Sequence, residues 1–82
     1  MDERTETLRV PAGERTTSEV LAELRRGDRV VIEVEMMGIT SDVVVRESQG
    51  TYYCDTPVKL LTYETPAGLR RCLERFRMTK PE

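Results

Sequence analysis

The stretch from residue 29 to residue 47 constrains the fold of this chain more than any other segment. It consists of two runs of largely alternating residues on either side of Met37-Gly38, a dipeptide that favours a tight turn. An antiparallel hairpin in which Ile32 faces Val43 gathers the apolar side chains on one face, whereas a slip of one residue would place Ile32 opposite Asp42. The predicted register pairs Met36 with Ile39, Val34 with Ser41, Ile32 with Val43 and Val30 with Val45, leaving Val31, Glu33 and Glu35 on the other face.

The remaining segments predict three more strands and two helices. Residues 5–10, 51–55 and 58–63 have strand-like patterns, while Thr16 and Glu19 form a capping-box sequence before an apolar stripe at 17–26. Thr65 and Pro66 mark the start of a second helix, in which apolar residues recur with helical spacing up to Phe76.

These elements predict one α+β domain over residues 1–82, in the order β-α-β-β-β-β-α. We expect a single, mostly antiparallel sheet of four to five strands with both helices on one face. We also expect residues 1–4 and 79–82 to be frayed.

A short helix, the run Gly27-Asp28-Arg29-Val30-Val31-Ile32, a turn at Gly38 and further strands resemble the Sm-like and SH3-like small barrels over residues 17–64. The resemblance implies a sheet that curls and buries both of its faces. In Sm-like proteins the uridine site uses an asparagine, and this chain contains none. The resemblance therefore does not imply uridine binding.

Composition excludes several classes of chemistry. The chain has no His, so catalytic triads and histidine-based zinc sites are excluded. We assign no catalytic, cofactor-binding or metal-binding residue, and we expect a protein that is not an enzyme. No apolar run approaches the ~20 residues that span a bilayer, and the charged N-terminus does not resemble a secretory signal. We expect a cytoplasmic protein with no membrane partner.

Two carboxylates face one another in the predicted hairpin, Glu33 and Asp42. Opposed like charges are unfavourable on a strand pair. The pair either binds a cation or shares a proton at a raised pKa, or it lies on a solvated face where Arg29 or Arg46 reaches across. We favour the solvated face, because water weakens the repulsion.

The two cysteines, Cys54 and Cys72, lie 18 positions apart in the sequence and therefore do not form a CxxC motif. We favour two reduced, buried thiols. A disulfide, a metal pair and a reactive thiol remain as alternatives, and the sequence does not show whether the two residues are neighbours.

The sheet face turned away from the helices is predicted to carry an apolar patch, which often marks an interface. From this patch we predict a small non-enzymatic interaction or regulatory module that self-associates, most simply as a homodimer. The alternative is a sheet that curls and buries the patch itself. The predicted interface comprises Val31, Val44, Tyr53, Leu61 and Tyr63.

The second helix carries a basic patch, which supports a different function. Arginines on one helix can bind the phosphate backbone of nucleic acid, or they can simply form a solvated helix exterior. The balance of 13 basic and 15 acidic residues does not favour nucleic acid, so we keep a nucleic-acid-binding accessory protein as the alternative. The patch comprises Arg70, Arg71, Arg75 and Arg77.

Overall fold

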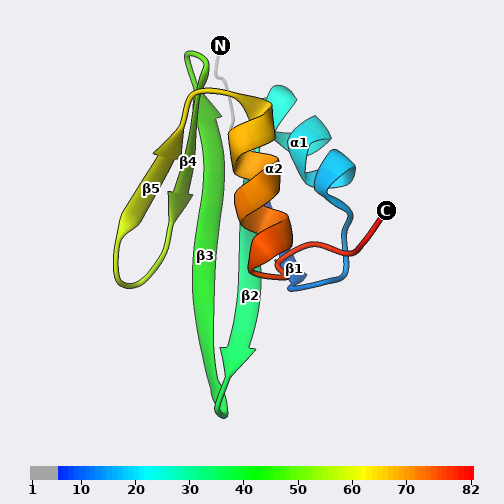
Figure 1. Cartoon of the computed structure of the whole chain (residues 1–82), viewed down its shortest axis with the longest axis vertical. Helices are drawn as coiled ribbons and strands as arrows, with labels where there is room; N and C mark the ends of the chain where they lie inside the picture. Colours follow the sequence, from blue (N-terminus) through cyan, green and yellow to red (C-terminus); the bar gives the residue numbers. More distant parts are fainter. Residues whose placement is uncertain (1–5) are drawn as a thin grey trace.

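The strands form one five-stranded sheet whose order in space, β1-β2-β3-β4-β5, follows the order in the sequence (Figure 1). The computed structural model describes residues 6–82, so the expectation for residues 1–4 lies outside the described part. β1 and β2 are parallel, and all other neighbours are antiparallel. The elements are β1 (Thr7–Pro11), α1 (Thr17–Arg25), β2 (Arg29–Met36), β3 (Ile39–Ser48), β4 (Thr51–Asp55), β5 (Leu60–Tyr63) and α2 (Pro66–Arg75).

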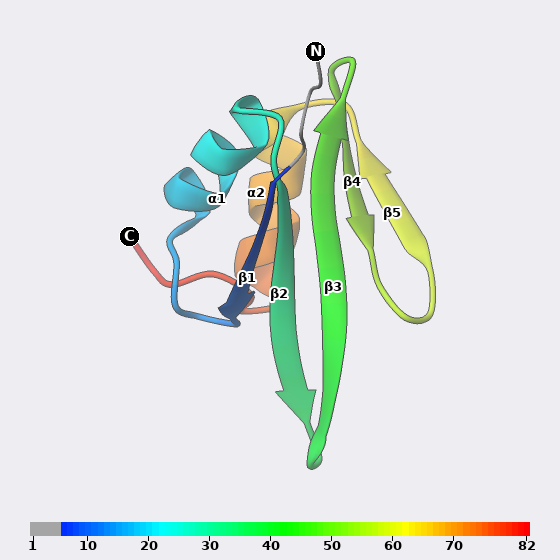
Figure 2. The same cartoon turned by 180° about the vertical axis from the view of Figure 1, so that it is seen from behind.

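The predicted α+β fold and the predicted element order are confirmed. Both helices lie on one face of the sheet, and the view from behind shows the other face without a covering layer (Figures 1 and 2). β1 and β5 form the two edges, so the sheet is open and not a closed barrel.

Local capping determines where both helices begin. The Thr16 hydroxyl accepts a 3.1 Å hydrogen bond from the Glu19 amide, and the Glu19 carboxylate accepts a 2.9 Å bond from the Thr16 amide, which is the predicted capping box. At α2, Thr65 accepts a 3.1 Å bond from the Gly68 amide, with Pro66 in the first turn. These caps satisfy amides that a helix cannot pair by itself.

The predicted register of the β2-β3 hairpin is confirmed, from Val30 opposite Val45 to Met36 opposite Ile39. Its two-residue loop places Met37 at φ 56° and Gly38 at φ 79°, the left-handed pair that such hairpins require. This conformation costs a residue with a side chain about 1–2 kcal/mol. Met37 therefore occupies a position where Asn, Asp or Gly is the usual choice.

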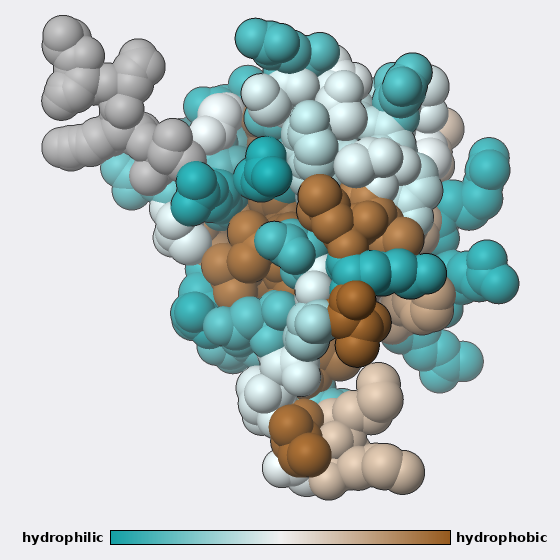
Figure 3. All heavy atoms as spheres, turned by 90° about the vertical axis from the view of Figure 1, so that its left-hand side faces the viewer, coloured by the Kyte–Doolittle hydropathy of each residue, from teal (hydrophilic) through white to brown (hydrophobic). Residues whose placement is uncertain are grey.

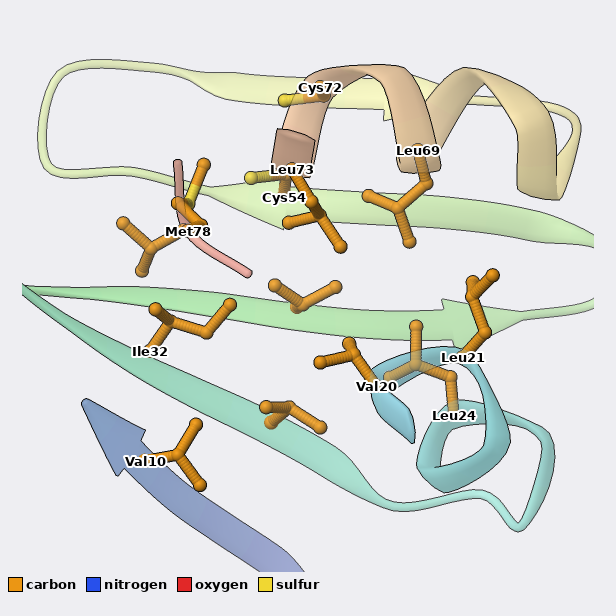
Figure 4. Packing of buried hydrophobic residues seen from close by; sticks show 13 residues of the cluster. Val10, Val20, Leu21, Leu24, Ile32, Cys54, Leu69, Cys72, Leu73 and Met78 are labelled. Atoms are coloured by element: carbon orange, nitrogen blue, oxygen red, sulfur yellow. The ribbon is translucent and has the colours of Figure 1, made fainter. Parts of the chain in front are cut away.

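The core lies between the helices and the inner face of the sheet (Figure 4). Leu24 of α1 and both Leu69 and Leu73 of α2 are fully buried, and they meet Val30 and Ile32, the residues predicted to point inward. Within residues 6–82 no buried polar side-chain atom lacks a hydrogen-bond partner.

The predicted orientation of the fifth strand is wrong. A loop at residues 56–59 connects β4 to β5 so that Asp55 lies opposite Leu60 and Cys54 opposite Leu61. Because Cys54 points into the core, Leu61 and then Tyr63 also turn to the helix side. Thr56 fixes the loop, since its amide and hydroxyl both donate to the carbonyl of Lys59.

The prediction that residues 79–82 are frayed is also wrong. Thr79 is buried and its hydroxyl lies 2.7 Å from that of Thr17. The Lys80 amide donates a 2.7 Å bond to the carbonyl of Arg15. Glu82 accepts 2.9 Å bonds from both the amide and the hydroxyl of Ser18. The end of the described chain therefore packs along the start of α1.

The β2-β3 hairpin extends past the helices at one end of the molecule (Figures 1 and 2). Its last residues have no helix above them, and Met36, Met37 and Ile39 are 65%, 95% and 67% exposed. We call these three residues the hairpin tip.

Candidate functional site

The outer sheet face carries a charge network in place of a cation site. Glu33 and Asp42 are direct partners, as predicted, and the guanidinium of Arg9 bridges them at 3.0 Å and 3.1 Å. Arg9 belongs to β1. It makes the contact with the two carboxylates that we expected from Arg29 or Arg46. Its hydrogen bonds to Asp42 and then to Glu33 raise the pKa of Arg9 above its ordinary value. The carboxylate oxygens thus already have a cation between them.

The predicted apolar interface is divided between two faces. Val31, Val44 and Tyr53 lie on the outer face, whereas Leu61 and Tyr63 pack against the core from the inner face. Val31 is 6% exposed in spite of its outward direction. Tyr53 carries the guanidinium of Arg46 at 4.2 Å from its ring centre, a cation–π contact. The outer face is therefore more polar than the sequence pattern indicated.

The basic patch on α2 is also divided. Arg70 bonds the carboxylates of Glu74 and Glu82 at 3.3 Å and 3.1 Å, so its charge is neutralised within the fold. In the described part of the chain, no ion pair involves Arg71, Arg75 or Arg77. Three of the four predicted arginines thus have no carboxylate partner in residues 6–82, and the guanidinium of Arg75 lies 5.8 Å from the ring centre of Phe76.

Arg71 and Arg75 border a hollow of about 190 Å³ between α2 and β5, which we call the α2-β5 hollow. Its wall is partly aromatic, because Phe76 is 59% exposed and Tyr63 turns toward α2. Gly68 permits the close approach, since a Cβ there would lie 3.1 Å from the ring of Tyr63. The lining residues are Tyr63, Gly68, Arg71, Cys72, Arg75 and Phe76.

The two cysteines are neighbours and are not joined in a disulfide. Cys54 of β4 and Cys72 of α2 both lie in the core where the helix packs on the sheet (Figure 4). Burial, followed by the neighbouring Cys72, raises the pKa of the Cys54 thiol to about 12. The polar contact with Cys72, followed by burial, raises the pKa of Tyr63 to about 12. A thiol with so high a pKa is a poor nucleophile.

Exposed apolar side chains that the sequence analysis did not identify lie on the hairpin tip and on the body of the molecule. Viewed from the β5 side, apolar side chains gather beside charged ones on the body, and a second apolar group caps the protruding hairpin (Figure 3). Besides the hairpin tip, the large exposed apolar residues are Val58, Leu60 and Phe76, which are 87%, 49% and 59% exposed. The apolar residues on both sides of the Met37-Gly38 turn could have predicted the exposed hairpin tip from the sequence.

Among the described residues, no three Cys, Asp or Glu side chains are grouped so that they could hold a metal ion. Neither helix described here has the length and apolar character needed to cross a bilayer.

The fold and surface together define a small α+β domain with one mixed sheet, which displays apolar and arginine side chains around α2 and the β2-β3 hairpin. The chain belongs to the Family of unknown function (DUF8001), which it matches over residues 4–81. No curated protein and no solved structure matches it.

Proposed function

We propose that this protein is a non-enzymatic interaction or regulatory module that self-associates. The observation that carries the proposal is the contrast between a buried core and six large apolar side chains left exposed, three of them together on the hairpin tip. Single exposed apolar residues are ordinary, but contiguous groups of them often mark interfaces. The divided patch on the outer sheet face gives less support, since charged side chains surround Val44 and Tyr53.

Sedimentation velocity over a wide range of protein concentrations tests self-association. We expect the weight-average mass to rise from that of a monomer toward that of a dimer. Apolar association should persist at high salt, because screening weakens charge pairs and leaves hydrophobic contacts intact. A monomer at every concentration would contradict the proposal.

The alternative is nucleic-acid binding, and the observation that favours it is the availability of Arg71, Arg75 and Arg77. Fluorescence anisotropy with labelled single- and double-stranded oligonucleotides at two salt concentrations separates the functions. Phosphate contacts should weaken steeply with salt. Arg71→Ala with Arg75→Ala should then reduce binding, while Arg70→Ala serves as the matched control because Arg70 is neutralised within the fold.

A further inference from the structure

We propose that the hairpin tip of one copy docks into the α2-β5 hollow of a second copy, and that the second copy does the same in return. This inference rests on the self-association proposed above and specifies its surfaces. The hollow of each copy is thus occupied by the hairpin tip of the other copy, which carries Met36, Met37 and Ile39 at the end of its β2-β3 hairpin.

The hairpin tip is built in a way that folding alone does not require. Met37 adopts φ 56° and is 95% exposed, so it gains no burial in return for an unfavourable backbone. The β3-β4 hairpin uses the same turn, with Gln49 at φ 53° and Gly50 at φ 85°, and places a polar residue at the equivalent position. An apolar residue at the exposed left-handed position is explained if it is buried against a partner.

The α2-β5 hollow matches the hairpin tip in both size and character. The side chains of Tyr63 and Phe76 line it, with the guanidinium of Arg75 5.8 Å from the ring centre of Phe76. Methionine makes favourable contacts with aromatic rings. Its volume of about 190 Å³ suits one or two of the three side chains of the hairpin tip.

The charges of the two surfaces are complementary. Arg71 and Arg75 border the hollow without an ion pair inside the described fold, while Glu35 precedes the hairpin tip and is exposed. Docking would bring Glu35 toward the two guanidinium groups. An anionic membrane is a less suitable partner for the hairpin tip than a second copy. Anionic membranes attract basic segments, and the segment beside the tip is acidic.

The positions of the two surfaces allow a closed dimer. The tip lies at one end of the long axis (Figure 1), and the hollow lies between α2 and β5. In the proposed dimer a two-fold axis relates the two copies, so that each tip occupies the other copy's hollow. Such an exchange closes on itself as an isologous dimer and does not propagate into a filament.

The first test uses Met37→Asn. Asn suits the left-handed turn better than Met, so the variant should melt at or above the temperature of the wild type while its dimer dissociation constant rises by about tenfold. The matched control is Gln49→Asn, which places Asn at the equivalent position of the β3-β4 turn. This variant should leave the dimer dissociation constant unchanged. An unchanged constant for Met37→Asn, or an equal loss in both variants, would overturn the inference.

The second test exchanges the charges. Glu35→Arg and the double variant Arg71→Glu with Arg75→Glu should each dimerise more weakly than the wild type. An equimolar mixture should restore association, because both tip-to-hollow contacts of the mixed dimer then join opposite charges. Native mass spectrometry detects the mixed dimer. A mixture that associates no better than its components would contradict the docking while leaving self-association itself intact. A wild type that is monomeric throughout would overturn both proposals.

Discussion

The hydroxyl oxygens of Thr17 and Thr79 lie 2.7 Å apart in the interior, although 62 residues separate them in the chain. Both side chains are buried, and the contact joins the first residue of α1 to the segment that follows α2. A neighbouring bond from the Gly13 amide to the Met78 carbonyl, at 3.1 Å, supports the same junction.

Thr79→Val should therefore destabilise the protein by about 1–3 kcal/mol, because it leaves the Thr17 hydroxyl buried without a partner. Urea unfolding followed by circular dichroism measures the change. The double variant Thr17→Val with Thr79→Val should recover part of the loss, since both polar groups are then removed. A double variant with the summed loss of the two single variants would show that the hydroxyl pair is not the cause.

Replacing Glu82 should reveal a pH-dependent contribution to stability. Hydrogen bonds from the Ser18 amide and hydroxyl, together with Arg70, lower the pKa of Glu82 below its ordinary 4.5. A lowered carboxyl pKa in the folded state stabilises the fold above pH 4.5 and loses that effect as the pH falls through the lowered value. Glu82→Gln should thus lower Tm by a few degrees at neutral pH and hardly at all in acid.

Differential scanning calorimetry across this pH range provides the measurement for Glu82→Gln. The control is Glu14→Gln, which removes an exposed carboxylate that lies apart from Ser18. A Tm difference between wild type and Glu82→Gln that stays constant down to strongly acidic pH would rule out the charged contact as its source.

Arg9→Ala should leave two facing carboxylates without their bridging cation. We expect a small decrease in Tm at low salt that shrinks at high salt, because ions screen the repulsion between Glu33 and Asp42. Adding Asp42→Asn to Arg9→Ala should restore most of the loss. Arg29→Ala is a suitable control on the same face. A decrease in the Tm of Arg9→Ala that did not depend on salt concentration would argue against the charge network.

The buried thiol of Cys54 should be inert in the folded protein. With a pKa of about 12 and a fully buried side chain, it presents little thiolate at neutral pH. In a Cys72→Ala background, a thiol-reactive chromophore should label Cys54 slowly in native buffer and rapidly in denaturant. The reciprocal variant Cys54→Ala should label sooner through Cys72, which borders the hollow. Rapid native labelling of Cys54 would contradict the packing.

The elements that the sequence predicted well are those whose signals are local. The register of Val30 to Met36 against Ile39 to Val45 followed from alternation around a two-residue turn, and the helix starts followed from Thr16 and Thr65. The inward direction of Leu61 did not follow, because the length of the loop before β5 decides which face each residue takes, and the sequence left that length open.

The surface was harder to predict, since it depends on contacts between distant segments. The position of Arg9 beside Glu33 and Asp42 requires β1 to pair in parallel with β2, which no turn specifies. The packing of Thr79 on Thr17 depends on the path of the chain after α2. The exposure of the hairpin tip depends on how far the helices extend over the sheet, and alternation along a strand carries no information on that.

The sequential order of the strands also has a kinetic consequence. Each strand pairs with the one next to it in the chain. The three antiparallel ladders need only a short loop to close, whereas the parallel β1-β2 ladder closes across the crossover that contains α1, and low contact order speeds folding. The contact between the segment after α2 and the start of α1 joins the most distant parts of the described chain. We expect the antiparallel hairpins to assemble first, β1 to join with α1, and the contact between the segment after α2 and the start of α1 to form last.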